Sequence, residues 1–349
     1  MKRAFSWLFT TLALGASVGC GANFDPGNEI KSLRVLAVKK DKPYAQPGDT
    51  VELQMLWDDA KGRTDVQRMF LGGCINPAGD LYYSCFPQYV QKLLDGTLPP
   101  PSKPDADSFS VTVPKNIISG RQGPFQPGQP HYGLYVVFFA LCAGRIDFVT
   151  DAPVKPDGSS GLPIRCLDAA DKPLSSDDFV VGYSSIYSFE GVSNENPSFT
   201  LDADGSVAFQ VGDASVPSDC VGEACQGAAA VSVDCDATPE RCIKACADDG
   251  DSKCPAIDVA PAIAQKVEKD QVSSDLFQSN VTEQMWINYY VDHGAINEVR
   301  LVNDSRSGWN PLYRGQLRAP KDPGPLQIWA VVHDNRGGVD FTRVTLQVQ

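Results

Sequence analysis

The first nineteen residues decide the compartment in which this chain folds, and so which bonds can hold its fold together. Met1-Lys2-Arg3 is basic, residues 4–18 are mostly apolar and carry no charge, and small residues precede Cys20. A basic start, an apolar stretch and a small-residue cleavage site are typical of a secretory signal peptide. The apolar stretch is shorter than the roughly 20 residues of a membrane-spanning helix. We therefore expect residues 1–19 to be removed and the rest of the chain to be exported.

The cysteine count fits export into an oxidising compartment. The chain has 11 cysteines, and one of them, Cys20, stands at the predicted cleavage site. An even number in an exported chain predicts a disulfide framework. The spacing suggests that Cys74 pairs with Cys85 across a turn and that Cys142 pairs with Cys166. The ten cysteines expected in disulfides are Cys74, Cys85, Cys142, Cys166, Cys220, Cys225, Cys235, Cys242, Cys246 and Cys254.

The Gly19-Cys20 junction resembles the lipobox of bacterial lipoproteins, in which the cysteine is acylated and becomes the first residue. A lipobox usually has Leu, Val or Ile three residues before the cysteine, where this chain has Ser17. The resemblance implies that acylated Cys20 inserts into membrane lipid and that residues 20–28 form a tether. More than one acyl chain makes such anchoring stable. Gly21 follows the cysteine where an acid would retain the protein at the inner membrane, so the analogy places the anchor in the outer membrane.

The charge balance excludes some partners. The chain has 30 Lys and Arg against 43 Asp and Glu, a net charge of −13. Nucleic-acid binding needs a positive surface, so no nucleic-acid partner is expected. Electrostatic docking on anionic lipid is disfavoured for the same reason. Hydrophobic residues make up 42% of the chain, which is enough to form a packed core.

The first half of the chain predicts a β-sandwich over residues 29–192. A Pro47-Gly48-Asp49 turn leads into residues 50–57, where apolar and polar residues alternate. This strand, turn and strand pattern resembles the opening of bacterial immunoglobulin-like domains. Residues 134–142 form the longest apolar run, as in a buried strand. Further strands are expected at 30–39, 66–72, 108–113 and 179–189, with a short helix at 87–95.

A polar segment at 193–197 predicts a linker, followed by a second sandwich over residues 198–349. Residues 325–339 resemble the closing hairpin of immunoglobulin-like domains of the PKD or cadherin type. Residues 218–255 hold six cysteines and few large apolar side chains, so we expect a cross-linked satellite outside both cores. A helical piece is expected within 256–270. The predicted fold class is all-β, with two tandem immunoglobulin-like sandwiches and a disulfide-rich insertion. The strands expected in the second sandwich are 284–291, 296–302, 325–333 and 339–348.

No motif in the chain predicts catalysis. There is no Gly-x-Ser-x-Gly, and the chain has 3 histidines, of which His333 is expected to face solvent at a hairpin. The cysteine cluster has no Cys-x-x-Cys and no histidine, which favours disulfides over zinc. We therefore expect neither enzyme activity nor a cofactor.

Two further patterns give candidate ligand contacts. Asp202 and Asp204 before Gly205 resemble the start of a calcium loop but lack the Glu that closes it. A second acidic group is an equally weak calcium candidate and consists of Asp248, Asp249 and Asp251. No bound metal is expected. Trp309, in a polar loop before Tyr313, is a candidate for stacking on a sugar or a partner; the alternative is burial in the core.

These observations predict a lipid-anchored protein of the cell envelope surface, with a non-catalytic binding or structural role. Its expected partners are membrane lipid and an envelope protein or polysaccharide. One alternative is a carbohydrate-binding or adhesive module. The other is an exported hydrolase that uses two carboxylates, which would require a paired acid cleft.

Overall fold

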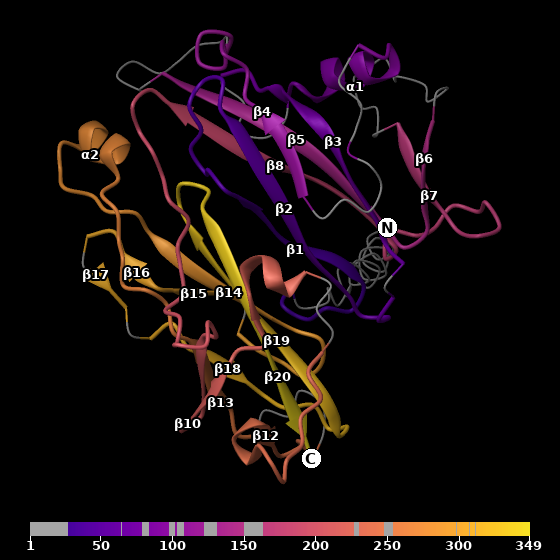
Figure 1. Cartoon of the computed structure of the whole chain (residues 1–349), viewed down its shortest axis with the longest axis vertical. Coiled ribbons are helices and arrows are strands. Elements are labelled where there is room, and N and C mark those ends of the chain that lie inside the picture. The colour runs from indigo at the N-terminus through magenta and orange to yellow at the C-terminus, as the bar shows by residue number, and fades with distance from the viewer. Residues whose placement is uncertain are drawn as a thin grey trace, which may run out of the picture.

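A computed structural model of the chain describes residues 27–63, 65–78, 84–97, 102, 108–121, 131–149, 163–226, 230–247, 254–297, 299–306, 308–310 and 312–349. Cys20 and the predicted signal peptide lie outside these residues. The described chain is almost entirely β-structure, arranged as two sandwiches, one above the other in Figure 1. In the described part, no helix is long and apolar enough to cross a bilayer.

The first sandwich packs two three-stranded antiparallel sheets on each other. One sheet has the order β1-β2-β4 and the other has the order β3-β5-β8. Immunoglobulin-like sandwiches place strands A, B and E on one sheet and C, F and G on the other, and this chain order is the same. The bounds are β1 Leu33–Lys40, β2 Thr50–Asp59, β3 Gln67–Ile75, β4 Ser108–Thr112, β5 Tyr132–Cys142 and β8 Phe179–Phe189.

The second sandwich repeats this strand order. Its sheets have the orders β10-β9-β13-β18 and β11-β20-β19-β14-β15, so β9, β13 and β18 take the places of A, B and E. Strands β14, β19 and β20 take those of C, F and G. The bounds in the first sheet are β9 Ala208–Val211, β10 Ala214–Pro217, β13 Ile257–Pro261 and β18 Gly315–Leu317. Those in the second are β11 Cys220–Val221, β14 Met285–Val291, β15 Val299–Leu301, β19 Gly324–Asp334 and β20 Val339–Val348.

The long apolar run of β5 is explained by burial on both faces of its sheet. Val137, Phe139 and Leu141 pack into the core of the first sandwich, while Val136 and Phe138 lie in a separate apolar cluster on the opposite face. A strand buried on one face alternates, and one buried on both is continuously apolar. The outer cluster lies beneath the helix α1, Phe86–Leu94, and the hairpin of β6, Arg145–Phe148, with β7, Ile164–Leu167.

Two disulfides attach this cover to the sheet. Cys74 of β3 is bonded to Cys85, one residue before α1. Cys142 at the end of β5 is bonded to Cys166 of β7. Both join cysteines that the sequence spacing suggested as partners. The first sandwich therefore has its outer face closed by covalently attached elements.

The two sandwiches pack through sheet faces. Leu36 and Leu56, on the outer face of the β1-β2-β4 sheet, share an apolar cluster with Trp329, Val331 and Phe341 of β19 and β20. All five side chains are buried, and Leu56, Val331 and Phe341 have 0% exposure. A register shift in β1 between residues 35 and 37 breaks the alternation predicted for 30–39 and accompanies the burial of Leu36 in this cluster. The junction thus has an apolar core of its own.

A buried ion cluster reinforces this junction. The turn between β19 and β20 carries Arg336, whose side chain is 3% exposed and bonds Glu283 at 2.6 Å and Glu268 at 2.5 Å. The guanidinium also lies over the ring of Tyr44 from the first sandwich, 5.9 Å from its centroid. The closing hairpin predicted from the sequence therefore also contacts the first sandwich.

The predicted linker, 193–197, lies in this junction. Asn196 donates a 2.6 Å hydrogen bond to the carbonyl oxygen of Lys40, in the first sandwich. The side-chain oxygen of Asn196 accepts a 2.9 Å bond from the amide of Val339, in the second. Among the described strands, no sheet combines strands from before and after this segment.

The cysteine-rich segment is not a satellite, contrary to our expectation for 218–255. Its strand β11 pairs with β20, as does β12, Cys242–Ile243, and together they cover an edge of the sheet. Ile243 is buried in the core of the second sandwich. Buried Asp219 accepts bonds from Arg241 at 2.8 Å and from Thr345 of β20 at 2.5 Å. By pairing with an edge strand of the sheet, the cysteine-rich segment gains hydrogen-bonding partners that its own composition does not reveal.

The helix expected within 256–270 is also wrong. Residues 257–261 form β13, which pairs with β9 and β18 as the central strand of its sheet. The helix α2 follows later, at Gln271–Phe277, where Asp270 caps it by accepting a bond from the amide of Ser273. Pairing on both sides outweighs the helical propensity of an alanine-rich segment. Two 3₁₀ turns, Gly222–Cys225 and Pro239–Arg241, complete the described elements together with the hairpin of β16, Asn303–Asp304, and β17, Gly308–Trp309.

Candidate functional site

Trp309 and Tyr313 come together beside the outer face of the β10-β9-β13-β18 sheet. Their ring centroids are 6.0 Å apart and their planes meet at 78°. Both side chains are half-buried and rest against the core of the second sandwich. One side of each ring packs inward, as the core-packing alternative predicts. The remainder of each side chain is accessible, as contact with a ligand requires.

Trp309 is held by the hairpin β16–β17. It pairs with Asn303, which is 0% exposed and donates a 2.7 Å bond to the carbonyl oxygen of Glu283. The side-chain oxygen of Asn303 accepts a 2.5 Å bond from the amide of Met285. Gly308 has a φ of 95°, a backbone conformation that L side chains rarely adopt. The turn before Trp309 therefore needs glycine, and the anchored asparagine keeps the hairpin against the sandwich.

Tyr313 is fixed at both ends. Its hydroxyl donates a 3.1 Å bond to the carbonyl oxygen of Pro261 in β13. Its own carbonyl oxygen accepts a 2.9 Å bond from the hydroxyl of buried Tyr289. Burial raises the pKa of Tyr313 above the usual tyrosine value, so the hydroxyl stays a neutral donor. The ring is therefore held in place without a ligand.

A hollow of about 370 Å³ lies beside these rings, and we name it the aromatic groove. Its floor is made by small outward-facing residues of β9 and β13, including Ala208 and Ala260, which leave space above the sheet. Gln210, Gln265 and Ser215 supply its neutral polar groups. The described lining is Ala208, Gln210, Ser215, Ala260, Pro261, Ala262, Gln265, Trp309, Tyr313 and Arg314.

The groove has no unbalanced charge in its described lining. Arg314 is the lining residue with a charge, and its guanidinium lies 3.5 Å from the carboxylate of Asp258. Both side chains of this pair are substantially exposed, so the pair contributes little to stability. A small hollow with aromatic walls and a few neutral polar groups has the composition of a binding site for a small ligand.

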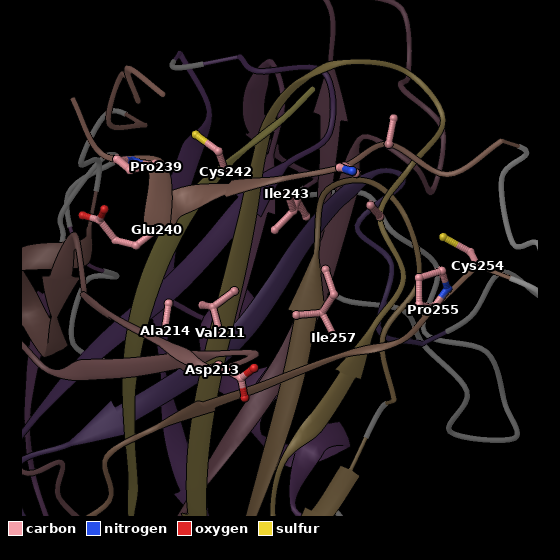
Figure 2. A pocket seen from close by; sticks show the side chains of 13 residues that line it. Val211, Asp213, Ala214, Pro239, Glu240, Cys242, Ile243, Cys254, Pro255 and Ile257 are labelled. Carbon is pink, nitrogen blue, oxygen red and sulfur yellow. The ribbon is translucent and has the colours of Figure 1, made fainter. Parts of the chain in front are cut away.

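A second hollow, the disulfide pocket, lies at the end of the same sandwich, between β9 and the cysteine-rich segment (Figure 2). It measures about 580 Å³ and is mostly apolar, with Val211, Ile243 and Ile257 in its wall. Asp213, Glu240 and Lys244 are its charged residues. In the view of Figure 2, Ala214 and Val211 lie between the side chains of Glu240 and Asp213. The other lining residues are Ala214, Pro239, Cys242, Ala245, Cys254, Pro255 and Ala319.

The first pair of calcium candidates belongs to a turn closed by its own bonds. The carboxylate of Asp204 accepts bonds from the amide and the hydroxyl of Ser206, at 3.0 and 2.7 Å. These bonds lower the pKa of Asp204. The carbonyl oxygen of Asp202 accepts a bond from the amide of Gly205. Asp248, Asp249 and Asp251 lie outside the described residues, and within those described no group of three or more His, Cys, Asp or Glu is placed to hold a metal.

All ten cysteines after Cys20 are disulfide-bonded. Besides the two bonds of the first sandwich, three short-range bonds lie in the cysteine-rich segment: Cys220–Cys225, Cys235–Cys242 and Cys246–Cys254. His333 differs from the expectation, because it is partly buried and stacks on Trp286 with centroids 5.3 Å apart. Burial, together with the charge of Lys40, lowers the pKa of His333 to about 4.

The floor and the polar groups of the aromatic groove were missed from the sequence. A usable signal was present in residues 207–211, where large Val and Phe alternate with Ala and Gln. Residues 259–263 show the same alternation, with Ala at two outward positions. Small side chains at successive outward positions of neighbouring strands indicate a shallow hollow, but only once the strands are known to pair.

No protein-family model matches the chain, and no curated protein matches it significantly. Among solved structures, the D00-D0 domain of Intimin is similar at 10% identity, with a TM-score of 0.20. The match covers 91% of this chain and 98% of that one. A TM-score of this size supports no argument about fold or function, so the immunoglobulin-like assignment is made here from strand order.

Proposed function

We propose that this chain is an exported protein, anchored in the outer membrane of a cell envelope by acylated Cys20, and that it acts as a non-catalytic binding protein. The binding site is the aromatic groove. The tether at 20–28 holds two sandwiches at the membrane surface, and the second sandwich presents the groove to an envelope component.

The observation that carries this proposal is a sheet face that holds a preformed hollow. In the described residues, the other three sandwich sheets are packed over part of their outer faces: two meet at the junction, and β3-β5-β8 lies partly under α1 and the β6–β7 hairpin. The outer face of the β10-β9-β13-β18 sheet carries the aromatic groove instead. A preformed hollow binds a ligand without the entropy cost of ordering its own side chains.

The chemistry of the groove favours binding over catalysis. Its described lining has no Asp, Glu, His or Cys. Ser215 has no lining residue that could serve as its general base, and the raised pKa of Tyr313 makes that hydroxyl a poor base or nucleophile. Five disulfides are consistent with an oxidising compartment, which supports export.

Labelling with radioactive palmitate tests the anchor. We expect the wild-type chain to incorporate label and to sediment with membranes, and the Cys20→Ala chain to do neither. Ser17→Ala changes the same junction but keeps the acceptor thiol, so it is the matched control and should be labelled. Label in the Cys20→Ala chain would exclude Cys20 as the acylated residue.

Cosedimentation with isolated, protein-stripped envelopes tests the binding role, using the full chain in mild detergent. We expect saturable binding that Trp309→Ala weakens at least fivefold. Phe277→Ala is the control, because Phe277 is 59% exposed on α2 and does not line the groove. Equal binding by the Trp309→Ala chain would show that the groove is not the site.

A further inference from the structure

We propose that the ligand of the aromatic groove is a neutral glycan, with one sugar ring stacked on Trp309 or Tyr313. This inference rests on the proposed function and names its ligand class. It follows from three properties of the groove, namely its two rings, its polar groups and its charge.

The rings offer flat apolar surfaces that need little reorganisation. Their 78° angle presents two faces that are nearly perpendicular, so a bound ring can lie on one and touch the edge of the other. Tyr313 is bonded at its hydroxyl and its carbonyl, and the hairpin of Trp309 is held by buried Asn303. Pyranose rings have an apolar C–H face that packs on such surfaces, and fixed aromatic side chains add little entropy cost on binding.

The polar groups match hydroxyls better than ions. Gln265 carries a donor and an acceptor in one side chain, and Ser215 carries both on one atom. Gln210 also carries both, and its amide nitrogen donates one 2.9 Å bond to the carbonyl oxygen of Gly212. A sugar hydroxyl also donates and accepts. Gln210 and Ser215 are partners on the neighbouring strands β9 and β10, and Gln265 lies in the loop after β13.

The charge excludes ionic ligands. The described lining has no carboxylate to attract a cation. Arg314 would attract an anion, but Asp258 lies 3.5 Å from it, and the whole chain has a net charge of −13. An anionic polysaccharide would therefore meet a repulsive field. A neutral polymer of sugars is the ligand class that this combination of aromatic, amide and hydroxyl groups accepts.

Calorimetric titration of the full chain in mild detergent tests the proposal. The probes are cellotetraose, chitotetraose, maltotetraose and mannotetraose, with tetragalacturonate as the anionic counterpart. We expect at least one neutral tetrasaccharide to bind, with an affinity that changes less than twofold between 50 and 500 mM salt. Binding of none of the four, or tighter binding of tetragalacturonate, would overturn the proposal.

Variants locate the binding. Trp309→Ala should weaken it at least tenfold, and Phe277→Ala should leave it unchanged. Because Trp309 also packs on the core, Gln265→Ala provides a second test, since Gln265 is exposed and its loss should weaken binding several-fold with an unchanged melting temperature. Equal affinity in both variants would overturn the glycan site. If no glycan binds but Trp309→Ala still reduces envelope binding, the proposed function stands and its ligand belongs to another class.

Discussion

The two sandwiches share one strand order and differ in what lies on their free faces. In the first, the outer face of the β3-β5-β8 sheet is closed by α1 and the β6–β7 hairpin, each attached by a disulfide. In the second, the outer face of the β10-β9-β13-β18 sheet is open and holds the aromatic groove. The site that we propose, the aromatic groove, therefore lies on the second sandwich.

The difference extends to the cysteines. Those of the first sandwich join a sheet strand to a covering element, whereas those of the second close short loops along β20. Disulfides thus hold the elements that cover a sheet face in the first sandwich and those that cover a sheet edge in the second. This comparison predicts which substitutions unfold the molecule and which act locally.

The largest effect is expected at the junction. Phe341→Ala removes a side chain with 0% exposure from the cluster shared by both sandwiches. We expect a loss of about 3–5 kcal/mol in the free energy of unfolding, because the surrounding sheets cannot close the cavity. Urea unfolding followed by tryptophan fluorescence measures it. Val181→Ala, at a position 48% exposed on β8, is the control and should change stability little. If Phe341→Ala costs no more than Val181→Ala, the junction is not a core.

The second test opens the cover of the first sandwich. Replacing Cys142 and Cys166 by Ala removes a cross-link with a sequence separation of 24. Restriction of the unfolded chain by a loop of this size stabilises by about 3 kcal/mol. Hydrogen exchange should rise in β6 and β7 and much less in β19. Unchanged exchange in the hairpin would mean that packing on Ile146 and Ile164 holds the cover without the disulfide.

The sequence predicts the strands well where the pattern is local. The continuous run at 134–142 and the alternation at 50–57 each indicated a strand, and β5 and β2 occupy these positions. The helix expected at 87–95 is α1. In these segments, burial follows from side-chain period, so the residues themselves carry the information.

The sequence fails where the partner is distant in the chain. Nothing in Cys242-Ile243 reveals that it pairs with Gln347 and Val348, and this pairing is why 218–255 is not a satellite. The groove shows the same limit, since Trp309 and Tyr313 were recognisable but the alanine floor depends on pairing between β9 and β13. Edge covers and hollows depend on long-range register, which a local pattern does not contain.

The third test concerns pH and the junction. Burial lowers the pKa of His333 to about 4, while in the unfolded chain it is near 6.5. Between these values the unfolded state binds the proton and the folded state does not, so stability falls as pH falls from about 6.5 to 4. At pH 5 the loss from this residue is about 2 kcal/mol. Urea unfolding at pH 7 and pH 5 should show this loss in the wild type and not in His333→Gln.

The control for this pH test is His293→Gln. The side chain of His293 is 65% exposed, so its removal should leave the wild-type pH dependence in place. A His333→Gln chain that loses as much stability on acidification as the wild type would show that His333 is protonated in the folded state. The stack on Trp286 would then join an imidazolium to the indole.

The smallest effect is expected at the covered edge of β20. Replacing Cys235 and Cys242 by Ala removes a cross-link with a sequence separation of only 7, which corresponds to about 2 kcal/mol or less. Cys242 pairs with Gln347, so its neighbours should loosen first, and exchange should rise in residues 235–243 and at 345–349. Strand β19 should keep its protection, because it pairs with β14 and β20 inside the sheet. If β19 exchanges as fast as the edge, the cysteine-rich segment supports the whole second sandwich. The contrast between disulfides that hold the cover of a face and disulfides that hold the cover of an edge would then be wrong.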